Sequence, residues 1–254
     1  MTCILAIGNS FSQDATYYLH QIAAADGTEL KVVNLYIGGC SLERHWENVR
    51  KDAADYLYEI NGESTQRYVS IRETLSEEKW DYIVTQQASH DSGWADTYEP
   101  FLGNLVDWLG ECAPQAKLLL QKTWAYEIDS THEKFPRYHN SQQEMYMRLS
   151  RAYDIAAKNH GLALIPCADI IQKLRTLPPF LYEKGGISLC RDGFHMDYLY
   201  GRYALAAAWY RALTGNCMKD NSYIPHSAFV PEEKADGHAL EVIRTVVDEM
   251  TVKI

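Results

Sequence analysis

The stretch that decides the fold is Cys3-Ile-Leu-Ala-Ile-Gly-Asn-Ser10-Phe-Ser12. Its apolar half predicts a buried strand, and the residues that follow, Gln13 to Ala25, have a helical pattern. The Gly-Asn-Ser turn between them therefore presents the Ser10 hydroxyl at the carboxyl end of a strand and the amino end of a helix. In open α/β sheets this edge is where ligands bind, and the free N–H groups of a helix start stabilise negative charge there.

A second motif, Asp192-Gly-Phe-His195, supplies the groups that a serine nucleophile needs. A serine hydroxyl attacks well only when a base takes its proton, and the base works best when a third group holds its tautomer. His195 has the chemistry of that base, and Asp192 is close enough along the chain to orient it. Either motif alone has a simpler explanation, since Asn, Ser and Asp also cap helices and turns. Together they predict a serine hydrolase with Ser10, His195 and Asp192 as its catalytic residues.

Five short apolar runs predict the buried strands of a parallel sheet. They are Cys3–Ile7, Lys31–Tyr36, Tyr82–Thr85, Lys117–Gln121 and Leu162–Pro166. Helical patterns lie between them, including Phe101–Cys112 and a long one over Ser141–Asn159, and a final helix is expected over Leu199–Leu213. Near-continuous apolar strands need helices on both faces of the sheet, so the alternation predicts a three-layer α/β/α sandwich with a five-stranded parallel sheet.

One segment, residues 55–72, breaks this alternation. It holds two strand-like runs, Asp55–Ile60 and Gln66–Ile71, around Asn61-Gly62, a pair that favours the tight turns of β-hairpins. The hairpin is either a lid or wall over the catalytic edge or a plain surface excursion, and the sequence does not choose between them. No linker, repeat or low-complexity tract divides the chain, so residues 1–254 are expected to form one domain.

The tetrahedral intermediate of acyl transfer needs hydrogen-bond donors for its oxyanion. The Ser10 N–H at the helix start is one candidate. Gly39 is a second, because a glycine that follows the second strand can direct its N–H into the cleft with no side chain in the way. A simple turn glycine is the alternative. The third donor should come from the loop after the third strand, where Gln87 is the first choice and Gln86 and His90 are its rivals.

Three blocks of the sequence resemble those of the SGNH (GDSL-type) hydrolase superfamily, in a bacterial branch. Gly8-Asn9-Ser10 matches the first block, normally Gly-Asp-Ser, and Gly39 falls on the oxyanion glycine of the second. Asp192-Gly-Phe-His195 matches the last block, Asp-x-x-His. Two positions depart from the pattern. Asn9 replaces the usual aspartate, and the third block, normally Gly-x-Asn-Asp, is replaced by Gln86-Gln-Ala-Ser-His-Asp91, which is similar to the Gln-Gly-Glu segment of sialate O-acetylesterase and acetylxylan esterase relatives.

The resemblance implies a sheet of flavodoxin-like order 2-1-3-4-5 and metal-free, cofactor-free ester hydrolysis through an acyl-enzyme on Ser10. It also implies small acyl groups, acetyl above all, carried on small molecules or oligosaccharides. Aromatic faces suit sugar rings, so the candidate substrate-binding residues are His90, Trp94, Trp124 and Tyr126, although such side chains more often pack in cores. The altered third block keeps one alternative open, a catalytically inactive carbohydrate-binding or scaffold protein on the same fold.

The bulk composition argues against other classes of function. The 254 residues carry a net charge of −10, which disfavours binding to nucleic acid. No apolar run approaches the ~20 residues of a membrane span, and the residues after Met1 lack the pattern of a secretion signal, so a cytoplasmic protein is expected. The nine histidines show no metal-ligand spacing, so no metal is expected. The oligomeric state cannot be read from the sequence.

The six cysteines are scattered, with no Cys-x-x-Cys pair, and are expected to be reduced. A cysteine hydrolase that uses Cys40 or Cys190 with His195 is a further alternative. Neither thiol, however, follows the first strand at a helix start, which is the setting that would lower its pKa.

Overall fold

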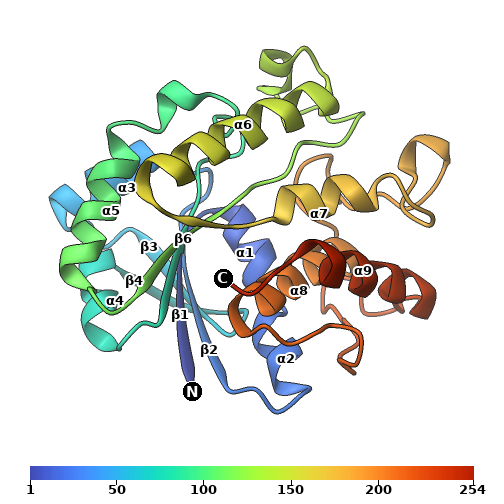
Figure 1. Cartoon of the computed structure of the whole chain (residues 1–254), viewed down its shortest axis with the longest axis horizontal. Coiled ribbons are helices and arrows are strands. Elements are labelled where there is room, and N and C mark those ends of the chain that lie inside the picture. Colours follow the sequence, from blue (N-terminus) through green and yellow to red (C-terminus); the bar gives the residue numbers. More distant parts are fainter.

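The computed structural model describes residues 1–254, and at its centre is a seven-stranded sheet with helices on both faces (Figure 1). The strand order is β4-β3-β2-β1-β5-β6-β7. The strands are β1 Thr2–Gly8, β2 Leu30–Tyr36, β3 Tyr56–Ile60, β4 Glu63–Val69, β5 Tyr82–Thr85, β6 Lys117–Gln121 and β7 Ala163–Ile165.

The five strands predicted from apolar runs are β2, β1, β5, β6 and β7, and they are parallel neighbours in the predicted order. At the centre, Ile4 of β1 pairs with Val32 of β2 on one side and with Tyr82 of β5 on the other. Ile4, Leu5 and Ile7 are fully buried, because helices cover both faces of this strand.

The prediction of a purely parallel, five-stranded sheet was incomplete, because the hairpin at residues 55–72 joins the sheet. Its first strand, β3, pairs antiparallel with β2, and β4 pairs antiparallel with β3. Asn61 and Gly62 both have positive φ (54° and 88°), as the tight hairpin turn requires. A Cβ on Gly62 would lie 2.3 Å from the Tyr17 carbonyl oxygen, so the turn packs closely against the end of α1. The segment therefore forms the edge of the sheet.

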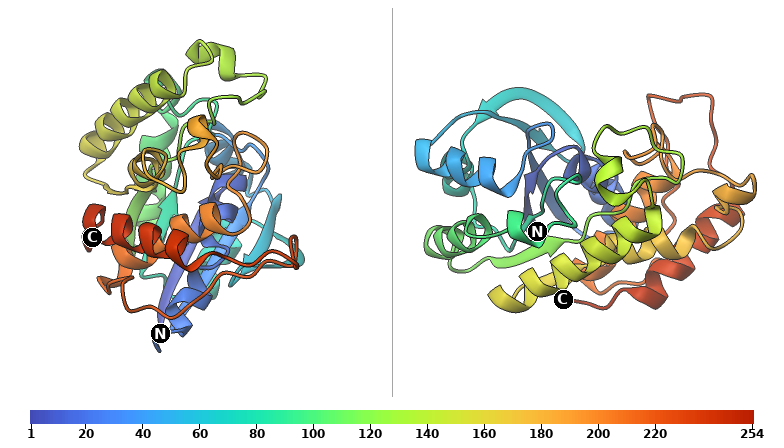
Figure 2. Two further views of the ribbon diagram at one scale, coloured as in Figure 1. Left: turned by 90° about the vertical axis from the view of Figure 1, so that its right-hand side faces the viewer. Right: turned by 90° about the horizontal axis from the view of Figure 1, so that it is seen from above.

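The helices form two layers (Figures 1 and 2). One layer contains α1 Ser10–Thr16, α2 Leu19–Ala24, α7 Cys167–Leu174, α8 Tyr200–Thr214 and α9 Gly237–Met250. The other contains α3 Leu42–Lys51, α4 Ile71–Glu77, α5 Phe101–Cys112 and α6 Gln142–His160. Three short 3-10 helices, η1 Ala95–Thr97, η2 Phe135–Tyr138 and η3 Tyr182–Lys184, lie in the loops.

Two helical predictions need correction. The pattern from Gln13 to Ala25 is divided into α1 and α2, and the helix predicted over Leu199–Leu213 is α8 but is not the last one, because α9 follows it. Helix α9 packs on the outside of α8, so α8 is covered by the sheet layer on one side and by α9 on the other. For this reason Tyr203, Trp209 and Tyr210 are fully buried on what would otherwise be a surface helix.

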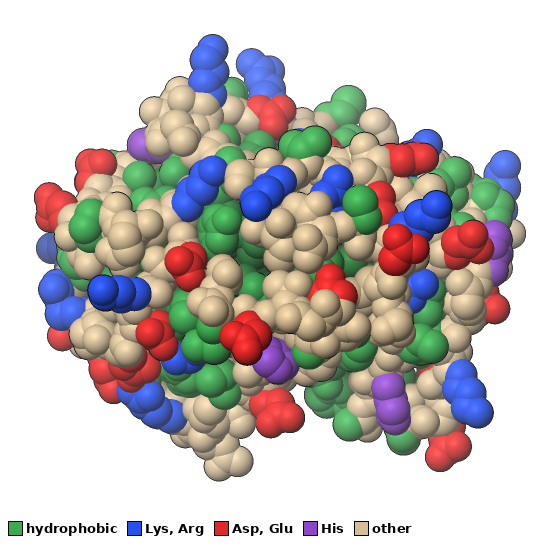
Figure 3. Space-filling view, turned by 60° about the horizontal axis from the view of Figure 1, so that its bottom comes forward, with side chains coloured by type: hydrophobic (Ala, Val, Ile, Leu, Met, Phe, Trp, Pro, Cys, Tyr) green, Lys and Arg blue, Asp and Glu red, His purple; other side chains and the backbone are tan.

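The negative net charge is not gathered into one patch on the face drawn in Figure 3, where acidic, basic and apolar side chains are interspersed. No helix combines the length and the apolarity that crossing a bilayer requires.

Candidate active site

The nucleophile turn is built by β1 and α1. Asn9 has an extended backbone and caps α1, its side-chain oxygen accepting a hydrogen bond from the Phe11 N–H at 2.9 Å. Ser10 is the first helical residue, and its own N–H therefore has no acceptor within the helix. A Cβ on Gly8 would lie 2.4 Å from the Ser12 Oγ, so only glycine allows the helix to begin this close to the strand.

Asn9 also connects three strand-end turns. Its Nδ2 donates to the Cys40 carbonyl oxygen at 3.0 Å, and its Oδ1 accepts a second hydrogen bond from the Gln86 Nε2 at 2.8 Å. An aspartate could accept from Gln86, but an ionised aspartate could not donate to Cys40. The replacement of the usual aspartate by Asn9 is therefore matched to the carbonyl group that faces it.

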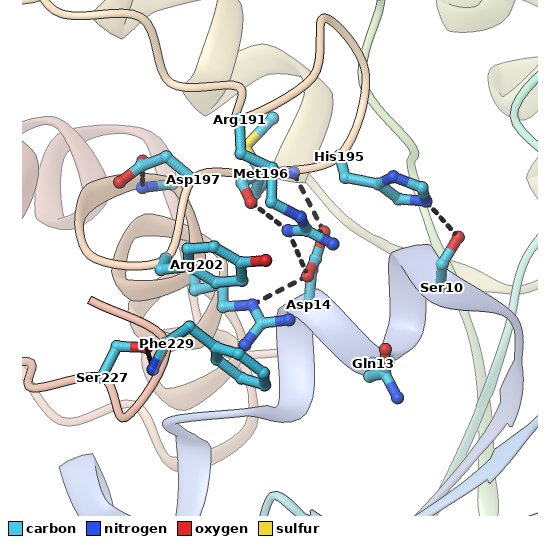
Figure 4. A network of polar contacts seen from close by, with 12 residues as sticks. Ser10, Gln13, Asp14, Arg191, His195, Met196, Asp197, Arg202, Ser227 and Phe229 are labelled. Carbon is cyan, nitrogen blue, oxygen red and sulfur yellow. Dashed lines mark hydrogen bonds and ion pairs between the residues drawn. The ribbon is translucent and has the colours of Figure 1, made fainter. Parts of the chain in front are cut away.

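Ser10, His195 and Asp192 form a continuous hydrogen-bonded chain, of which Figure 4 shows the contact between Ser10 and His195. The His195 Nε2 lies 2.8 Å from the Ser10 Oγ, and the His195 Nδ1 lies 2.7 Å from an Asp192 carboxylate oxygen. The other Asp192 oxygen accepts from the backbone N–H groups of His195 (2.8 Å) and Phe194 (3.2 Å). The three residues that the sequence singled out, 185 positions apart at the extremes, are thus brought into contact by the fold.

The protonation of Asp192 suits an orienting role. Partial burial would raise the pKa of this carboxyl, but hydrogen bonds from the His195 ring and from its backbone N–H outweigh burial and lower the pKa below its ordinary value. Asp192 is therefore ionised at neutral pH. It can hold the proton-bearing Nδ1 and leave Nε2 free to accept the Ser10 proton.

Trp124, predicted to line the substrate site, instead supports the loop that carries His195. Its indole is fully buried, stacks on Phe11 at 4.0 Å between ring centroids, and donates from Nε1 to the Phe194 carbonyl oxygen at 2.8 Å. The Glu127 N–H donates to the neighbouring Gly193 carbonyl oxygen at 2.7 Å. The segment after β6 therefore fixes the loop that carries His195.

Tyr126 and Trp94 are likewise packed rather than open. Tyr126 is fully buried, with its hydroxyl bonded to the Ser89 Oγ at 2.9 Å. Trp94 is partly buried, with the guanidinium groups of Arg137 and Arg148 4.8 and 5.1 Å from its ring. Neither presents a free aromatic face to a sugar in this conformation.

His90 stays a candidate substrate-binding residue, and two neighbours that the sequence analysis missed join it. The His90 side chain is 29% exposed and its ring stacks near that of His132, with centroids 6.4 Å apart. The His132 ring is 4.7 Å from that of Phe194, which lies 4.1 Å from the imidazole of His195. Phe194 lies inside the Asp-x-x-His block, but nothing near His132 in the sequence marked it.

Two of the predicted oxyanion donors have N–H groups that donate no hydrogen bond within the protein. Gly39 is exposed, has a φ of +63°, and donates no backbone hydrogen bond within the protein. Its loop is joined to the nucleophile turn by the bond between Asn9 and the adjacent Cys40. The Ser10 N–H, at the first position of α1, is the second unpaired donor at this edge.

Gln87 does not offer a donor, which corrects the first choice made from the sequence. It is buried, and its Nε2 donates both hydrogens to Thr97, to the carbonyl oxygen at 2.9 Å and to Oγ1 at 3.1 Å. Its Oε1 accepts from the N–H groups of Leu42 and Ala88. Gln86 differs, because only one of its amide hydrogens is used, in the bond to Asn9.

The cysteine alternative meets an electrostatic obstacle. Cys40 and Cys190 are both buried, and burial raises the pKa of each thiol to about 12. Both are therefore protonated at neutral pH, whereas a nucleophilic cysteine needs its thiolate. The structure contains no group of three or more His, Cys, Asp or Glu side chains arranged to hold a metal ion.

Large cavities lie away from the hydrogen-bonded chain. Cavities of about 690, 460 and 410 Å³ are lined by residues other than Ser10, His195 and Asp192. A smaller cavity of about 220 Å³ adjoins Asp192 and is lined mainly by polar side chains, among them Glu127 and Arg191.

The sheet order, the nucleophile turn after β1 and the Asp-x-x-His loop together define an SGNH-type (GDSL-type) hydrolase fold, as the sequence blocks predicted. The lipase/acylhydrolase from Enterococcus faecalis matches with a TM-score of 0.54 and 17% identity over 85% of this chain and 96% of that one. A catalytic mutant of the acetylxylan esterase Axe2 from Geobacillus stearothermophilus matches with a TM-score of 0.53 and 15% identity over 83% of this chain and 93% of that one. At these identities the similarity defines the fold.

Within that class, the chain belongs to the family described as "Domain of unknown function (DUF4886)", whose sequence profile matches residues 3–239. A crystal structure of a DUF4886 family protein from Bacteroides uniformis superposes with a TM-score of 0.88 and 38% identity, covering 98% of this chain and 93% of that one. A search among proteins of curated function gives no match.

Proposed function

We propose that this protein is a serine esterase that hydrolyses small-acyl esters, acetyl esters above all, with carbohydrates as the alcohol part. The observation that carries the proposal is the chain Ser10–His195–Asp192, with both hydrogen bonds already at 2.8 and 2.7 Å. A residue set that has lost its function would have no reason to keep a serine, an imidazole and a carboxylate in this order and at these distances. This argues for an active enzyme over an inactive carbohydrate-binding or scaffold protein.

The reaction follows from these contacts. His195 takes the Ser10 proton at Nε2 as the Ser10 Oγ attacks the ester carbonyl carbon. The carbonyl π electrons move to the oxygen, and the oxyanion accepts hydrogen bonds from the N–H groups of Ser10 and Gly39. The imidazolium, stabilised by ionised Asp192, then gives its proton to the departing alcohol. Water, activated by the same imidazole, releases the acid from the acyl-enzyme.

Gln86 is our choice for a third oxyanion donor. Its Nε2 has one hydrogen left after the bond to Asn9, and its side chain packs against the nucleophile turn, 3.5 Å from the position that a Cβ on Gly8 would occupy. Gln87, by contrast, has no hydrogen left to give. An asparagine amide and a glutamine amide are equivalent donors.

A short acyl group is favoured by the packing around His195. Phe194 lies against the imidazole, and Trp124 and Tyr126 fill the space behind the loop. The cavities of about 400 Å³ and more, which could hold a long chain, are lined by other parts of the molecule. The partly exposed rings of His90 and His132 offer polar and aromatic contacts to an alcohol such as a sugar.

The test is hydrolysis of p-nitrophenyl acetate, butyrate and octanoate by the wild-type protein and by Ser10→Ala, with labelling by a fluorophosphonate in parallel. We expect acetate to be preferred, labelling at Ser10, and loss of both in the variant. Acetylated xylo-oligosaccharides would follow as the natural type of substrate. A preference for octanoate would contradict the small acyl group, and a folded wild-type protein that neither turns over nor labels would contradict the enzymatic proposal.

A further inference from the structure

Asp14 is a buried carboxylate on the helix that carries the nucleophile. It lies four residues after Ser10 on α1, one helical turn away, and its side chain is fully buried. A buried carboxylate is costly unless it is paired and hydrogen-bonded. The groups that donate hydrogen bonds to the Asp14 carboxylate therefore indicate its structural role.

Three of the four hydrogen bonds to Asp14 come from the catalytic loop (Figure 4). The Arg191 Nη1 donates to both carboxylate oxygens, at 3.0 and 3.2 Å, and the Met196 N–H donates at 2.9 Å. Arg191 immediately precedes Asp192, and Met196 immediately follows His195. Asp14 thus holds the loop on both sides of its catalytic residues.

The two ends of this loop are also hydrogen-bonded to each other. The Arg191 N–H donates to the His195 carbonyl oxygen at 3.0 Å, the Arg191 guanidinium bonds the Met196 carbonyl oxygen, and Cys190 and Met196 form an isolated β-bridge. The segment between them therefore moves as one unit. Its position relative to α1 is set where this unit meets Asp14.

Helix α1 is itself fixed from two sides. Arg202 of α8 donates from Nε to Asp14 at 2.8 Å, from behind the loop. On the other side, the Gln13 Nε2 donates to Glu59 of the hairpin at 2.5 Å, and the Asn34 Nδ2 donates to the other Glu59 oxygen at 2.7 Å. The helix is therefore a firm support for Ser10 and Asp14 alike.

From these contacts we infer that Asp14 is a positioning residue, which sets the Ser10–His195 distance by holding the loop of residues 190–196 against the nucleophile helix. This inference rests on the proposed function. Ser10 and Asp14 are separated by one rigid turn of α1. Any displacement of the loop from Asp14 therefore changes the 2.8 Å contact between the Ser10 Oγ and the His195 Nε2. A misplacement of about 1 Å is enough to cost on the order of 10²-fold in rate.

The first test is Asp14→Asn, which keeps the shape of the side chain and removes its charge. We expect kcat for Ser10-dependent acetate ester hydrolysis to fall about 30-fold to 300-fold, with KM within about threefold, since the substrate does not touch Asp14. Asp248→Asn is the matched control. Asp248 also accepts two backbone N–H groups, from Met218 and Lys219, and lies near Arg211, but on α9. The kcat of the Asp248→Asn variant should equal that of the wild-type protein.

A second variant keeps the test decisive if Asp14→Asn does not fold. Arg191 is 19% exposed, so Arg191→Gln should fold, and it breaks the same contact from the loop side. We expect a similar loss of kcat, and a double variant that is no more than about threefold worse than the worse single one, because both changes release the same loop. Normal kcat in Arg191→Gln, or additive losses, would overturn the inference.

A spectroscopic readout separates this inference from the proposed function. Imidazole nitrogen and carbon chemical shifts of His195, assigned with His195→Gln, report whether the ring keeps its bond to Asp192. We expect the wild-type and Asp248→Asn shifts to coincide and Asp14→Asn or Arg191→Gln to shift or broaden the His195 signals. Unchanged signals in both variants would refute the positioning role. An inactive wild-type protein would refute the esterase proposal, and the chemical shifts would still decide the role of Asp14.

Discussion

The turns after β1 and β5 lie at the same edge of the sheet on neighbouring strands, and both are rich in amide side chains. After β1, Asn9 uses its hydrogen bonds to build the turn, and this leaves the Ser10 hydroxyl bonded only to His195 and the Ser10 N–H unpaired. After β5, Gln87 is saturated by Thr97, Leu42 and Ala88.

A position at this edge of the sheet does not by itself make a side chain available to a substrate. Whether a side chain at that edge can act on a substrate depends on how many of its donors and acceptors the protein itself already uses. The adjacent residues Gln86 and Gln87 differ in this respect, since the Gln86 amide has one unused hydrogen and the Gln87 amide has none.

The largest effect is expected at the reactive turn itself. Ser10→Ala removes the attacking oxygen and should lower kcat by about 10⁴-fold to 10⁶-fold, while the fold is kept because the hydroxyl contacts only His195. Steady-state kinetics with p-nitrophenyl acetate, with circular dichroism as the folding control, measures this. A residual rate above one per cent of wild type would mean that another group is the nucleophile.

The next effect separates the two glutamines. Gln86→Leu should lower kcat by about 10²-fold to 10³-fold, the usual consequence of losing one oxyanion donor, with a small change in KM. Gln87→Leu in the same assay is the matched control and should stay within about threefold of wild type. A larger loss of kcat in Gln87→Leu than in Gln86→Leu would indicate that Gln87 is the oxyanion donor.

Asn9→Asp tests whether the turn depends on a donor toward Cys40. The carboxylate would face the Cys40 carbonyl oxygen instead of donating to it. We expect a loss of about 10-fold to 10²-fold in kcat, because the shifted turn moves both Ser10 and the Gly39 loop. Kinetics and the thermal midpoint are measured together, and an Asn9→Asp enzyme as active and as stable as wild type would show that the donor is dispensable.

For Gln87→Leu the expected effect is on stability instead of rate. The substitution leaves the buried N–H groups of Leu42 and Ala88 without their acceptor and should lower the free energy of unfolding by about 1–3 kcal/mol. Urea denaturation followed by circular dichroism measures the change. A variant as stable as wild type would mean that these bonds contribute little.

The smallest effect is expected from thiol chemistry. Because burial raises the pKa of Cys40 and Cys190 to about 12, iodoacetamide at pH 7 should leave the esterase activity unchanged over an hour. The exposed Cys217 should be alkylated under the same conditions, which mass spectrometry verifies. Inactivation that parallels alkylation of Cys40 or Cys190 would revive the cysteine mechanism.

Much of the fold followed from local patterns. The apolar runs predicted the five parallel strands, since strands buried on both faces carry a strong and continuous signal, and the family resemblance supplied their order. The hairpin was predicted from Asn61-Gly62, but its pairing with β2 was not, because a hairpin's own sequence does not specify which edge it will join. Helix α9 was missed, and with it the reason why α8 is buried on nearly every side.

Ser10, Asp192 and His195 could be read from the sequence by itself, because the chemistry demands those residue types in short motifs beside a strand end. Tertiary structure alone decided the roles of the side chains around them. Gln87 and Trp124 look available in the sequence and are used up in packing and internal hydrogen bonds. In the sequence, Asp14 is an ordinary polar residue of a helix. Only the fold brings it into contact with Arg191, Met196 and Arg202, which are almost 200 residues away. Motifs record what the reaction needs, whereas burial and hydrogen-bond saturation depend on which distant segments fold together.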